Sequence, residues 1–160
     1  MEIKLMTRTE ETVKIYFEKA QDPFIKAMLP QKAQSVKEAL ADYRETLLPS
    51  ATSYGRTIWA DGQYVGDVWC YCIDSAEEPN AMLSYCIFNC SYRNKGIATK
   101  AVSSFLQEIY RKFKLQSIGA FTFSENLASI RVLEKVGFSF IENFTEDGKE
   151  SKYYQLTFQQ

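Results

Sequence analysis

The 160-residue sequence contains no histidine. Serine hydrolases and cysteine proteases that use an imidazole as their general base are therefore excluded. Any proton transfer must use Glu, Asp, Tyr, Ser, Cys or water. A zinc site would need an unusual set of ligands, because the four cysteines include no Cys-x-x-Cys pair. We therefore predict no metal site.

The four cysteines do not suggest a disulfide framework. Cys70 and Cys72 fall on the same face of a strand that is predicted over residues 64–73, and Cys86 and Cys90 precede a glycine-containing turn. We predict that at least three of the four are buried, reduced thiols that pack as small hydrophobic side chains. A chain of this length needs no covalent staple, because it can bury roughly two thirds of its unfolded surface in one core.

Long apolar runs and an excess of one charge are also missing. Glu2 places a charge at the second position and no long apolar stretch follows, so we expect neither a signal peptide nor a transmembrane helix, and a cytoplasmic protein is the default. The formal net charge is −1 and the pI is near 5.6. This balance gives no support for a nucleic-acid or membrane partner.

The composition is that of a globular protein, with 46% hydrophobic and 14% aromatic residues. No internal repeat, low-complexity tract or linker divides the chain, so residues 1–160 are expected to form one mixed α/β domain. Hydrophobic periodicity predicts seven strands. They cover residues 3–6, 53–60, 64–73, 83–88, 117–123, 138–144 and 152–158.

Four helices are predicted between these strands. Two of them follow patterns of the Ser/Thr-x-x-Glu capping box, at Thr7–Glu10 and at Ser35–Glu38. A third carries a long apolar face between residues 101 and 113, and a fourth follows residue 126. Residues 23–34 are predicted to be a linker, whose apolar side chains form either core or the wall of a substrate pocket. These side chains are Phe24, Met28 and Leu29.

A turn that contains glycine joins the strand at 83–88 to the longest helix. This glycine turn reads Arg93-Asn94-Lys95-Gly96-Ile97-Ala98. A helix that begins here presents unpaired backbone N–H groups and a positive dipole end, which together suit phosphate oxygens. Gly96 allows close approach of a ligand, and Arg93 and Lys95 add positive charge. Taken alone, the pattern is also compatible with an ordinary strand-to-helix turn.

Further motifs follow the glycine turn in a characteristic order. Arg93-x-x-Gly96-x-Ala98 is followed by Asn126-x-x-Ser129 and then by Glu134-Lys135-Val136-Gly137-Phe138. In this order the motifs resemble the GNAT acetyltransferase superfamily, and the run from 126 to 138 is similar to its RimJ/RimL-like branch. The resemblance covers nearly the whole chain. It implies a central, mostly antiparallel twisted sheet of about seven strands, flanked by about four helices.

The resemblance also implies acetyl-CoA as the acetyl donor. The pantetheine arm would run along the strand near Ile87 and Phe88, and Asn126 would contact it. Asn126 is also a good helix N-cap, and both roles can hold at once. The pyrophosphate would bind to the glycine turn and the start of the helix. The residues implied there are Arg93, Asn94, Lys95, Gly96, Ile97, Ala98 and Thr99.

The implied chemistry is direct attack of an amine on the thioester. Many GNAT enzymes carry a Tyr seven residues after the Asn, but Leu133 stands at that position here. The RimJ/RimL-like pattern implies Ser129 in its place, with its hydroxyl protonating or hydrogen-bonding the CoA sulfur; the alternative is a hydrogen bond from Ser129 to the backbone. Tyr85 is the second catalytic candidate, with core packing as its alternative. The candidates for a general base are a water relay and several carboxylates. These carboxylates are Asp67, Asp74, Glu77 and Glu78.

The sequence therefore predicts an N-acetyltransferase that acts on a primary amine. The acceptor is either a protein or peptide N-terminus or a small-molecule amine. An α-amine, with a pKa near 8, is neutral far more often at pH 7 than a lysine amine near 10.4, so a site without histidine favours the former. The alternatives are a non-catalytic acyl-CoA sensor and an interaction domain. A monomer and a homodimer are both compatible with the sequence.

Overall fold

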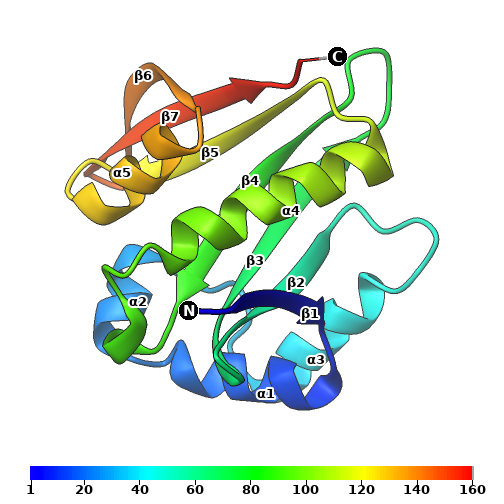
Figure 1. Cartoon of the computed structure of the whole chain (residues 1–160), viewed down its shortest axis with the longest axis vertical. Coiled ribbons are helices and arrows are strands. Elements are labelled where there is room, and N and C mark those ends of the chain that lie inside the picture. Colours follow the sequence, from blue (N-terminus) through cyan, green and yellow to red (C-terminus); the bar gives the residue numbers. More distant parts are fainter. Residues whose placement is uncertain (160) are drawn as a thin grey trace.

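The computed structural model describes residues 1–159, whose strands form one seven-stranded sheet in the order β1-β2-β3-β4-β5-β7-β6 (Figure 1). Strands β4 and β5 are parallel, and the other neighbouring pairs in this range are antiparallel. The predicted mixed α/β class and mostly antiparallel sheet are confirmed. The strands are β1 (Ile3–Thr7), β2 (Tyr54–Ala60), β3 (Gln63–Asp74), β4 (Asn80–Ile87), β5 (Ser117–Phe123), β6 (Ser139–Glu146) and β7 (Lys149–Thr157).

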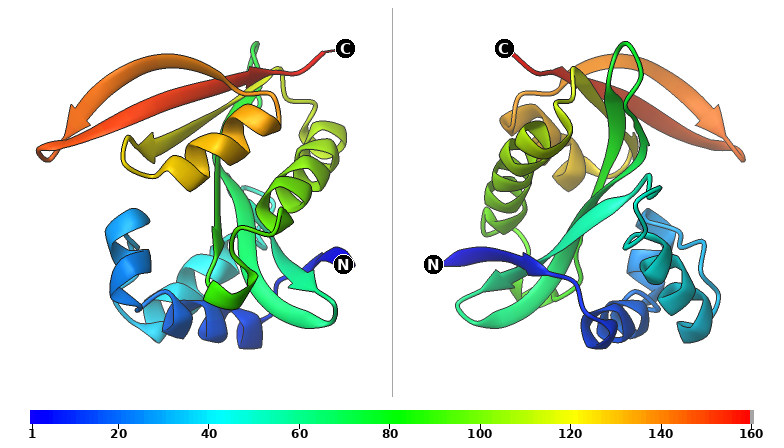
Figure 2. Two further views of the ribbon diagram at one scale, coloured as in Figure 1. Left: turned by 60° about the vertical axis from the view of Figure 1, so that its left-hand side comes forward. Right: turned by 90° about the vertical axis from the view of Figure 1, so that its right-hand side faces the viewer.

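Helices cover both faces of the sheet. Helices α4 and α5 lie on one face, whereas α1, α2 and α3 lie on the other face, against its N-terminal half (Figure 2). The helices of residues 1–159 are α1 (Glu10–Lys19), α2 (Pro23–Met28), α3 (Val36–Glu45), α4 (Ile97–Phe113) and α5 (Leu127–Lys135), with a short 3₁₀ turn η1 (Cys90–Tyr92). Within this range, no helix is long and apolar enough to cross a membrane.

Helix α2 occupies part of the predicted linker, so the prediction of an irregular segment is wrong there. Asp22 caps the helix: its Oδ1 accepts hydrogen bonds from the backbone N–H of Phe24 at 2.9 Å and of Ile25 at 3.3 Å. Pro23 suits the first helical position, where no donor is needed. Phe24 is 55% exposed and is not core, whereas Leu29 lines a cleft that is described below.

The capping prediction for α1 is also wrong in register. The N-cap is Thr9, whose Oγ1 accepts from the N–H of Thr12 at 3.1 Å, while the Thr12 hydroxyl oxygen accepts from the N–H of Thr9 at 2.9 Å. Thr12 therefore takes the place that the capping box usually gives to Glu. Ser35 is confirmed as the N-cap of α3, with its Oγ accepting from the N–H of Glu38 at 3.1 Å.

The main core lies between α4 and the sheet. The predicted apolar face of α4 is confirmed: its buried side chains pack against buried residues of β2, β3, β4 and β5. Burying one large side chain such as Phe105 contributes about 1.5–3 kcal/mol, so this face anchors α4 firmly and positions its N-terminus. The buried residues of α4 are Ile97, Ala101, Val102, Phe105, Leu106 and Ile109.

The prediction of at least three buried cysteines is wrong. Cys70 is fully buried and Cys86 is half-buried, but Cys72 and Cys90 are exposed. The regular alternation of β3 fails at Cys72 because its φ is +52° and the register with β4 shifts between Tyr71 and Asp74. This irregularity in the strand turns the thiol of Cys72 to solvent. All four cysteines are free.

Candidate active site

The sheet opens between β4 and β5. These two strands pair only over Asn80–Met82 and Ser117–Gly119. Beyond that point β4 stays paired with β3 and β5 stays paired with β7, so Leu83–Ile87 and Ala120–Phe123 diverge from each other (Figures 1 and 2). Backbone groups on the facing edges of these strands are therefore left without a partner strand. An extended ligand can use them as a neighbouring strand would.

The N-terminus of α4 lies at the open end of β4. Gly96 is the N-cap, in a left-handed conformation with φ +78°, and a Cβ there would meet nothing within 4 Å. Throughout the described chain, the backbone N–H groups of residues 94–99 find no acceptor, and the N–H of Lys100 is the first to bond, to the Gly96 carbonyl at 3.2 Å. This helix start is open, uncapped and positively polarised, as an anion site requires.

Arg93 has a different role from that of its neighbours in the turn. Its N–H already donates to the carbonyl of Cys90 at 3.3 Å. Its side-chain Nε donates to the carbonyl of Ile87 at 3.1 Å, and its guanidinium lies 5.1 Å from the ring centre of Phe24. Arg93 therefore ties the glycine turn to the end of β4 and to α2, rather than offering a free backbone amide as the resemblance implied.

The two predicted catalytic residues contact each other across the opening. The Tyr85 hydroxyl lies 3.0 Å from Oγ of Ser129 and donates to the Ser129 carbonyl at 3.2 Å. Burial raises the pKa of Tyr85 to about 12, and the hydrogen bond with Ser129 offsets this only in part. Tyr85 is therefore a neutral phenol at pH 7, so it can donate a proton or a hydrogen bond.

Asn126 caps α5 as predicted. Its Oδ1 accepts from the N–H of Ser129 at 3.1 Å, and its side-chain NH₂ finds no acceptor within residues 1–159. The cap therefore leaves one polar group free for a ligand. Leu133, at the position where a Tyr is usual, is 1% exposed and belongs to the core. Phe88 is also buried, and it packs edge-on against Tyr64.

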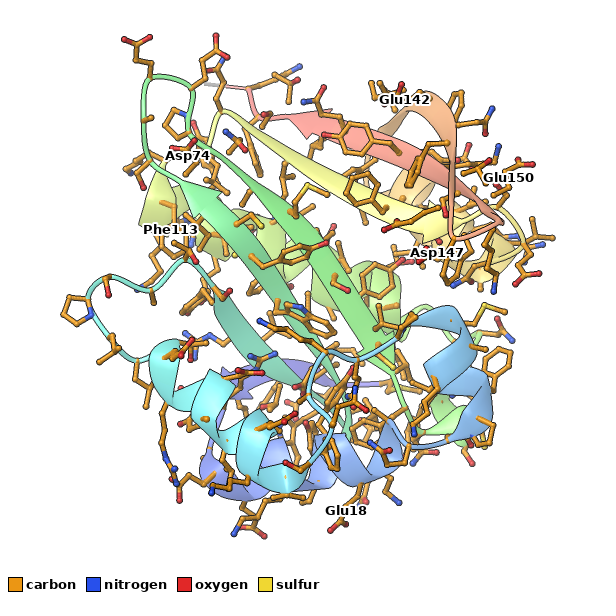
Figure 3. The ribbon with its side chains drawn as sticks, turned by 180° about the vertical axis from the view of Figure 1, so that it is seen from behind. Glu18, Asp74, Phe113, Glu142, Asp147 and Glu150 are labelled. Carbon is orange, nitrogen blue, oxygen red and sulfur yellow. The ribbon has the colours of Figure 1, made fainter. Side chains whose placement is uncertain are left out.

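The candidate carboxylates separate into two groups. Asp74, Glu77 and Glu78 lie at the end of the sheet where β4 and β5 are still joined, far along β3 from the opening (Figure 3). The prediction that these three carboxylates are candidates for a general base is therefore wrong, because they lie far from the opening. Asp67 lies at the other end, opposite Cys86 in the register of β3 and β4.

Asp67 is 3% exposed and is held by two partners. One is the Tyr64 hydroxyl, which donates to its Oδ1, and the other is Arg8, whose Nη2 lies 3.5 Å from its Oδ2. Burial raises the pKa of Asp67 to about 6, while Arg8 and Tyr64 act in the opposite direction. In the described chain, the buried Nε of Arg8 has no hydrogen-bond partner.

A cleft of about 850 Å³ lies between α1, α3 and the face of β3 and β4 that carries Asp67. We call it the α3 cleft. Ser84 lines it, whereas the side chain of the next residue, Tyr85, points to the other face of the sheet and meets α5. Strand β4 therefore faces the α3 cleft on one side and α5 on the other. Sequence reasoning missed this cleft, apart from Leu29 as a possible pocket wall.

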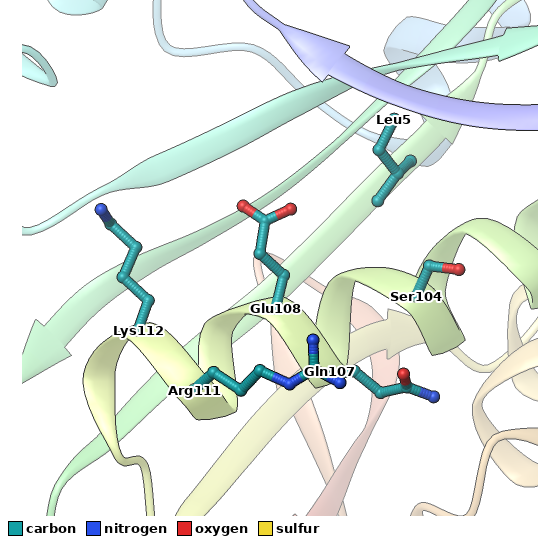
Figure 4. A pocket seen from close by; sticks show the side chains of 6 residues that line it. All are labelled: Leu5, Ser104, Gln107, Glu108, Arg111 and Lys112. Atoms are coloured by element: carbon teal, nitrogen blue, oxygen red, sulfur yellow. The ribbon is translucent and has the colours of Figure 1, made fainter.

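A second hollow, of about 490 Å³, lies between α4 and β1 (Figure 4). Glu108, one of the charged residues that line it, accepts a hydrogen bond from Nε of Arg56 at 2.9 Å and another from the Tyr54 hydroxyl. Because this pairing holds β2 against α4, we assign it a structural role. Among residues 1–159, no group of three or more His, Cys, Asp or Glu side chains could hold a metal ion.

An opened sheet beside an uncapped helix start offers free strand edges for an extended ligand and unpaired N–H groups for an anionic one. The family model for the acetyltransferase (GNAT) domain matches residues 3–139. The chain therefore belongs to the GNAT acetyltransferase family, as the motifs predicted. No curated protein sequence is significantly similar to the chain.

Solved structures of several acetyltransferases share this fold. The chain is similar to a spermidine N-acetyltransferase from Vibrio cholerae in complex with CoA and spermine, with a TM-score of 0.86, 15% identity and coverage of 97% of this chain and 95% of that one. It is also similar to the aminoglycoside acetyltransferase AAC(6')-Ib in complex with coenzyme A, with a TM-score of 0.81, 18% identity and coverage of 98% and 95%. Mycobacterium smegmatis RimJ in complex with CoA-disulfide gives 0.82 and 19%, with coverage of 97% and 81%.

Proposed function

We propose that this protein transfers the acetyl group of acetyl-CoA to a primary amine by direct attack on the thioester. The observation that carries the proposal is the uncapped start of α4 beside the opening between β4 and β5. The similar structures support acetyl-CoA as the donor, since they contain CoA.

In this proposal the pyrophosphate binds the unpaired N–H groups of residues 94–99, with Lys95 adding charge and Arg93 holding the turn in place. These amides belong to Asn94, Lys95, Gly96, Ile97, Ala98 and Thr99. The pantetheine arm follows the free edge of β4 toward Ile87 and Phe88 and meets the side-chain NH₂ of Asn126.

The chemistry follows from this placement. A neutral amine entering through the α3 cleft attacks the thioester carbonyl, so a C–N bond forms and the C–S bond breaks. Unpaired N–H groups on β4 stabilise the negative charge that develops on the carbonyl oxygen. Tyr85 gives a proton to the departing thiolate and regains one from water, and Ser129 orients the Tyr85 hydroxyl. The proton of the amine passes to water or to Asp67 at the floor of the cleft.

A thermal melt with acetyl-CoA tests donor binding. At a concentration a hundredfold above the dissociation constant, binding adds about 2.7 kcal/mol, which raises the Tm of a domain of this size by several degrees. Gly96→Glu should abolish the shift, because its side chain puts a negative charge where the pyrophosphate binds. Gly62→Glu is the matched control: Gly62 has φ +80° and, like Gly96, open space around it. The absence of a shift at millimolar acetyl-CoA would overturn the proposal.

A non-catalytic acyl-CoA sensor is the second candidate, because the usual Tyr position is the buried Leu133. Release of free thiol in the presence of an amine separates the two, since a sensor binds acetyl-CoA without turnover. We also propose that the protein acts in the cytoplasm, as a monomer or homodimer, without nucleic-acid or membrane partners. Its net charge of −1 supports the last point.

A further inference from the structure

Helix α3 stands away from the sheet. None of its residues is buried, and its main contacts are with α1. The α3 cleft fills the space that a packed helix face would otherwise occupy. The face of α3 that is turned toward this space carries Ala39, Asp42, Tyr43 and Thr46, a spacing that places side chains on one side of a helix.

The wall that α3 presents to the cleft is acidic. Asp42 and Glu45 both line the cleft and are three residues apart, so they are neighbours on the helix surface. Neither has a cationic partner within 4 Å in residues 1–159, and Arg44 between them is paired with Glu10 at 2.8 Å. Lys32 is the cation that lines the rim without a partner in this range.

The floor of the cleft is aromatic. Trp69 and Tyr71 alternate along one face of β3 and both line the cleft, with Asp67 on the same face two positions before. Ser84 lies opposite Trp69 in the register of β3 and β4, so the aromatic floor extends to β4. The Arg8 guanidinium lies 5.7 Å from the Trp69 ring centre, and its charge is balanced by Asp67. Aromatic faces of this kind attract a positively charged group that is partly removed from water.

The α3 cleft is a groove that opens to solvent. Its walls are α1, residues 29–33, α3 and residues 48–53, and its floor is β3 and β4. A volume of about 850 Å³ is that of a small-molecule site. The same cleft therefore contains a free acidic pair on one wall, an aromatic floor and Ser84 of β4. A compact ligand can contact all three.

We propose that the acceptor is a small diamine or polyamine, whose second ammonium group binds Asp42 and Glu45 while its reacting amine lies beside Ser84. This inference rests on the proposed function, because it names the acceptor for the same transfer. The alkyl stretch between the two amines lies over Trp69 and Tyr71. A peptide N-terminus without a basic side chain leaves the acidic wall unused and is a poorer acceptor.

The test compares 1,4-diaminobutane with butylamine, which has the same carbon chain and lacks the second charge. With saturating acetyl-CoA and a free-thiol assay, kcat/KM for the diamine should exceed that for butylamine by about tenfold, the size expected for two exposed carboxylates that act together. Asp42→Asn combined with Glu45→Gln should reduce this ratio to about one. Glu77→Gln combined with Glu78→Gln removes the same charge from an exposed loop at the other end of the sheet, and should leave both rates unchanged.

Each other outcome separates this inference from the proposed function. Equal kcat/KM values for the two amines, or a faster reaction with an acidic or neutral peptide N-terminus, would overturn the diamine assignment and keep the transferase. A protein whose Tm rises with acetyl-CoA but that acetylates neither these amines nor a peptide N-terminus would overturn the diamine assignment and favour the non-catalytic sensor. Failure of acetyl-CoA to bind would remove the proposed function itself. Melting without ligand shows that each variant is folded.

Discussion

Asp67 is almost completely buried and is paired with the Arg8 guanidinium. Desolvation dominates and raises its pKa from 3.8 to about 6. Between those two pH values the folded protein binds more protons at this site than the unfolded chain, so the contribution of Asp67 to stability falls as pH rises through that window. The group therefore ionises close to neutral pH, at the floor of the α3 cleft.

This ionisation predicts the pH dependence of an Asp67→Asn variant. From pH 4 to pH 7.5, wild type should lose roughly 2–3 kcal/mol of unfolding free energy relative to the variant, because the amide does not titrate. Urea denaturation at the two pH values measures the difference. Parallel stability profiles for the two proteins would contradict the raised pKa.

Tyr85 and Ser129 predict unequal effects on turnover. Tyr85→Phe keeps the ring and removes the proton donor, so kcat should fall about a hundredfold with the acetyl-CoA melting shift unchanged. Ser129→Ala should cost only a few-fold, because Tyr85 also donates to the Ser129 carbonyl, which alanine retains. Single-turnover release of thiol from bound acetyl-CoA measures both. A larger loss in Ser129→Ala than in Tyr85→Phe would assign the proton transfer to Ser129 instead.

At the scale of elements, sequence patterns predicted the structure best where one periodicity extended over a long segment. The apolar face of α4 and the range of β5 were predicted correctly, as was the glycine turn between β4 and α4. Residue 23 was predicted to begin a linker, whereas Asp22 caps α2 and Pro23 begins it. Local patterns identify a boundary more readily than they show that a second, short element starts at it.

The α3 cleft could not be predicted in the same way. Its residues come from α1, α3, β3 and β4, and their proximity depends on how far α3 stands from the sheet. No local pattern encodes that distance. The contact between Tyr85 and Ser129 is likewise tertiary: both residues were predicted as catalytic, but their pairing across the opening was not.

The cap of α2 gives a prediction for one element. Asp22→Ala removes the acceptor for two backbone N–H groups and should cost about 1 kcal/mol, or about 2–4 °C in Tm. Asp22→Asn retains a capping oxygen and should leave Tm almost unchanged. Thermal melts of the two variants side by side decide the matter, and an equal loss in both would mean that the Asp22 charge, rather than its capping oxygen, stabilises the protein.

For the whole molecule, the sheet consists of two halves joined by three paired positions between β4 and β5. Helix α4 packs against the first half and also contacts α5, which covers the second half. The proposed donor site takes groups from both halves, the glycine turn from one and Asn126 from the other. A bound ligand therefore connects parts of the molecule that share few backbone hydrogen bonds.

Hydrogen exchange provides a test at this scale. The amides of residues 94–99 lack acceptors and should exchange rapidly in the free protein. Acetyl-CoA should slow their exchange, and should also slow that of residues 126–129. The hairpin at residues 61–62 serves as a control and should not change. Protection confined to one half of the sheet would show that the ligand does not bridge the two.

The incomplete pairing of β4 and β5 has a consequence for the empty protein. Strands β4 and β5 lie in the middle of the sheet, yet each has a stretch of backbone N–H and C=O groups without a partner strand. Natural sheets normally protect such unpaired groups even on their edge strands. In the proposed donor site, the pantetheine chain along β4 acts as a surrogate strand and takes up the free backbone groups of β4. The cofactor would then serve as a folding partner as well as a reactant, and a cell depleted of it would hold a protein that is more prone to self-association.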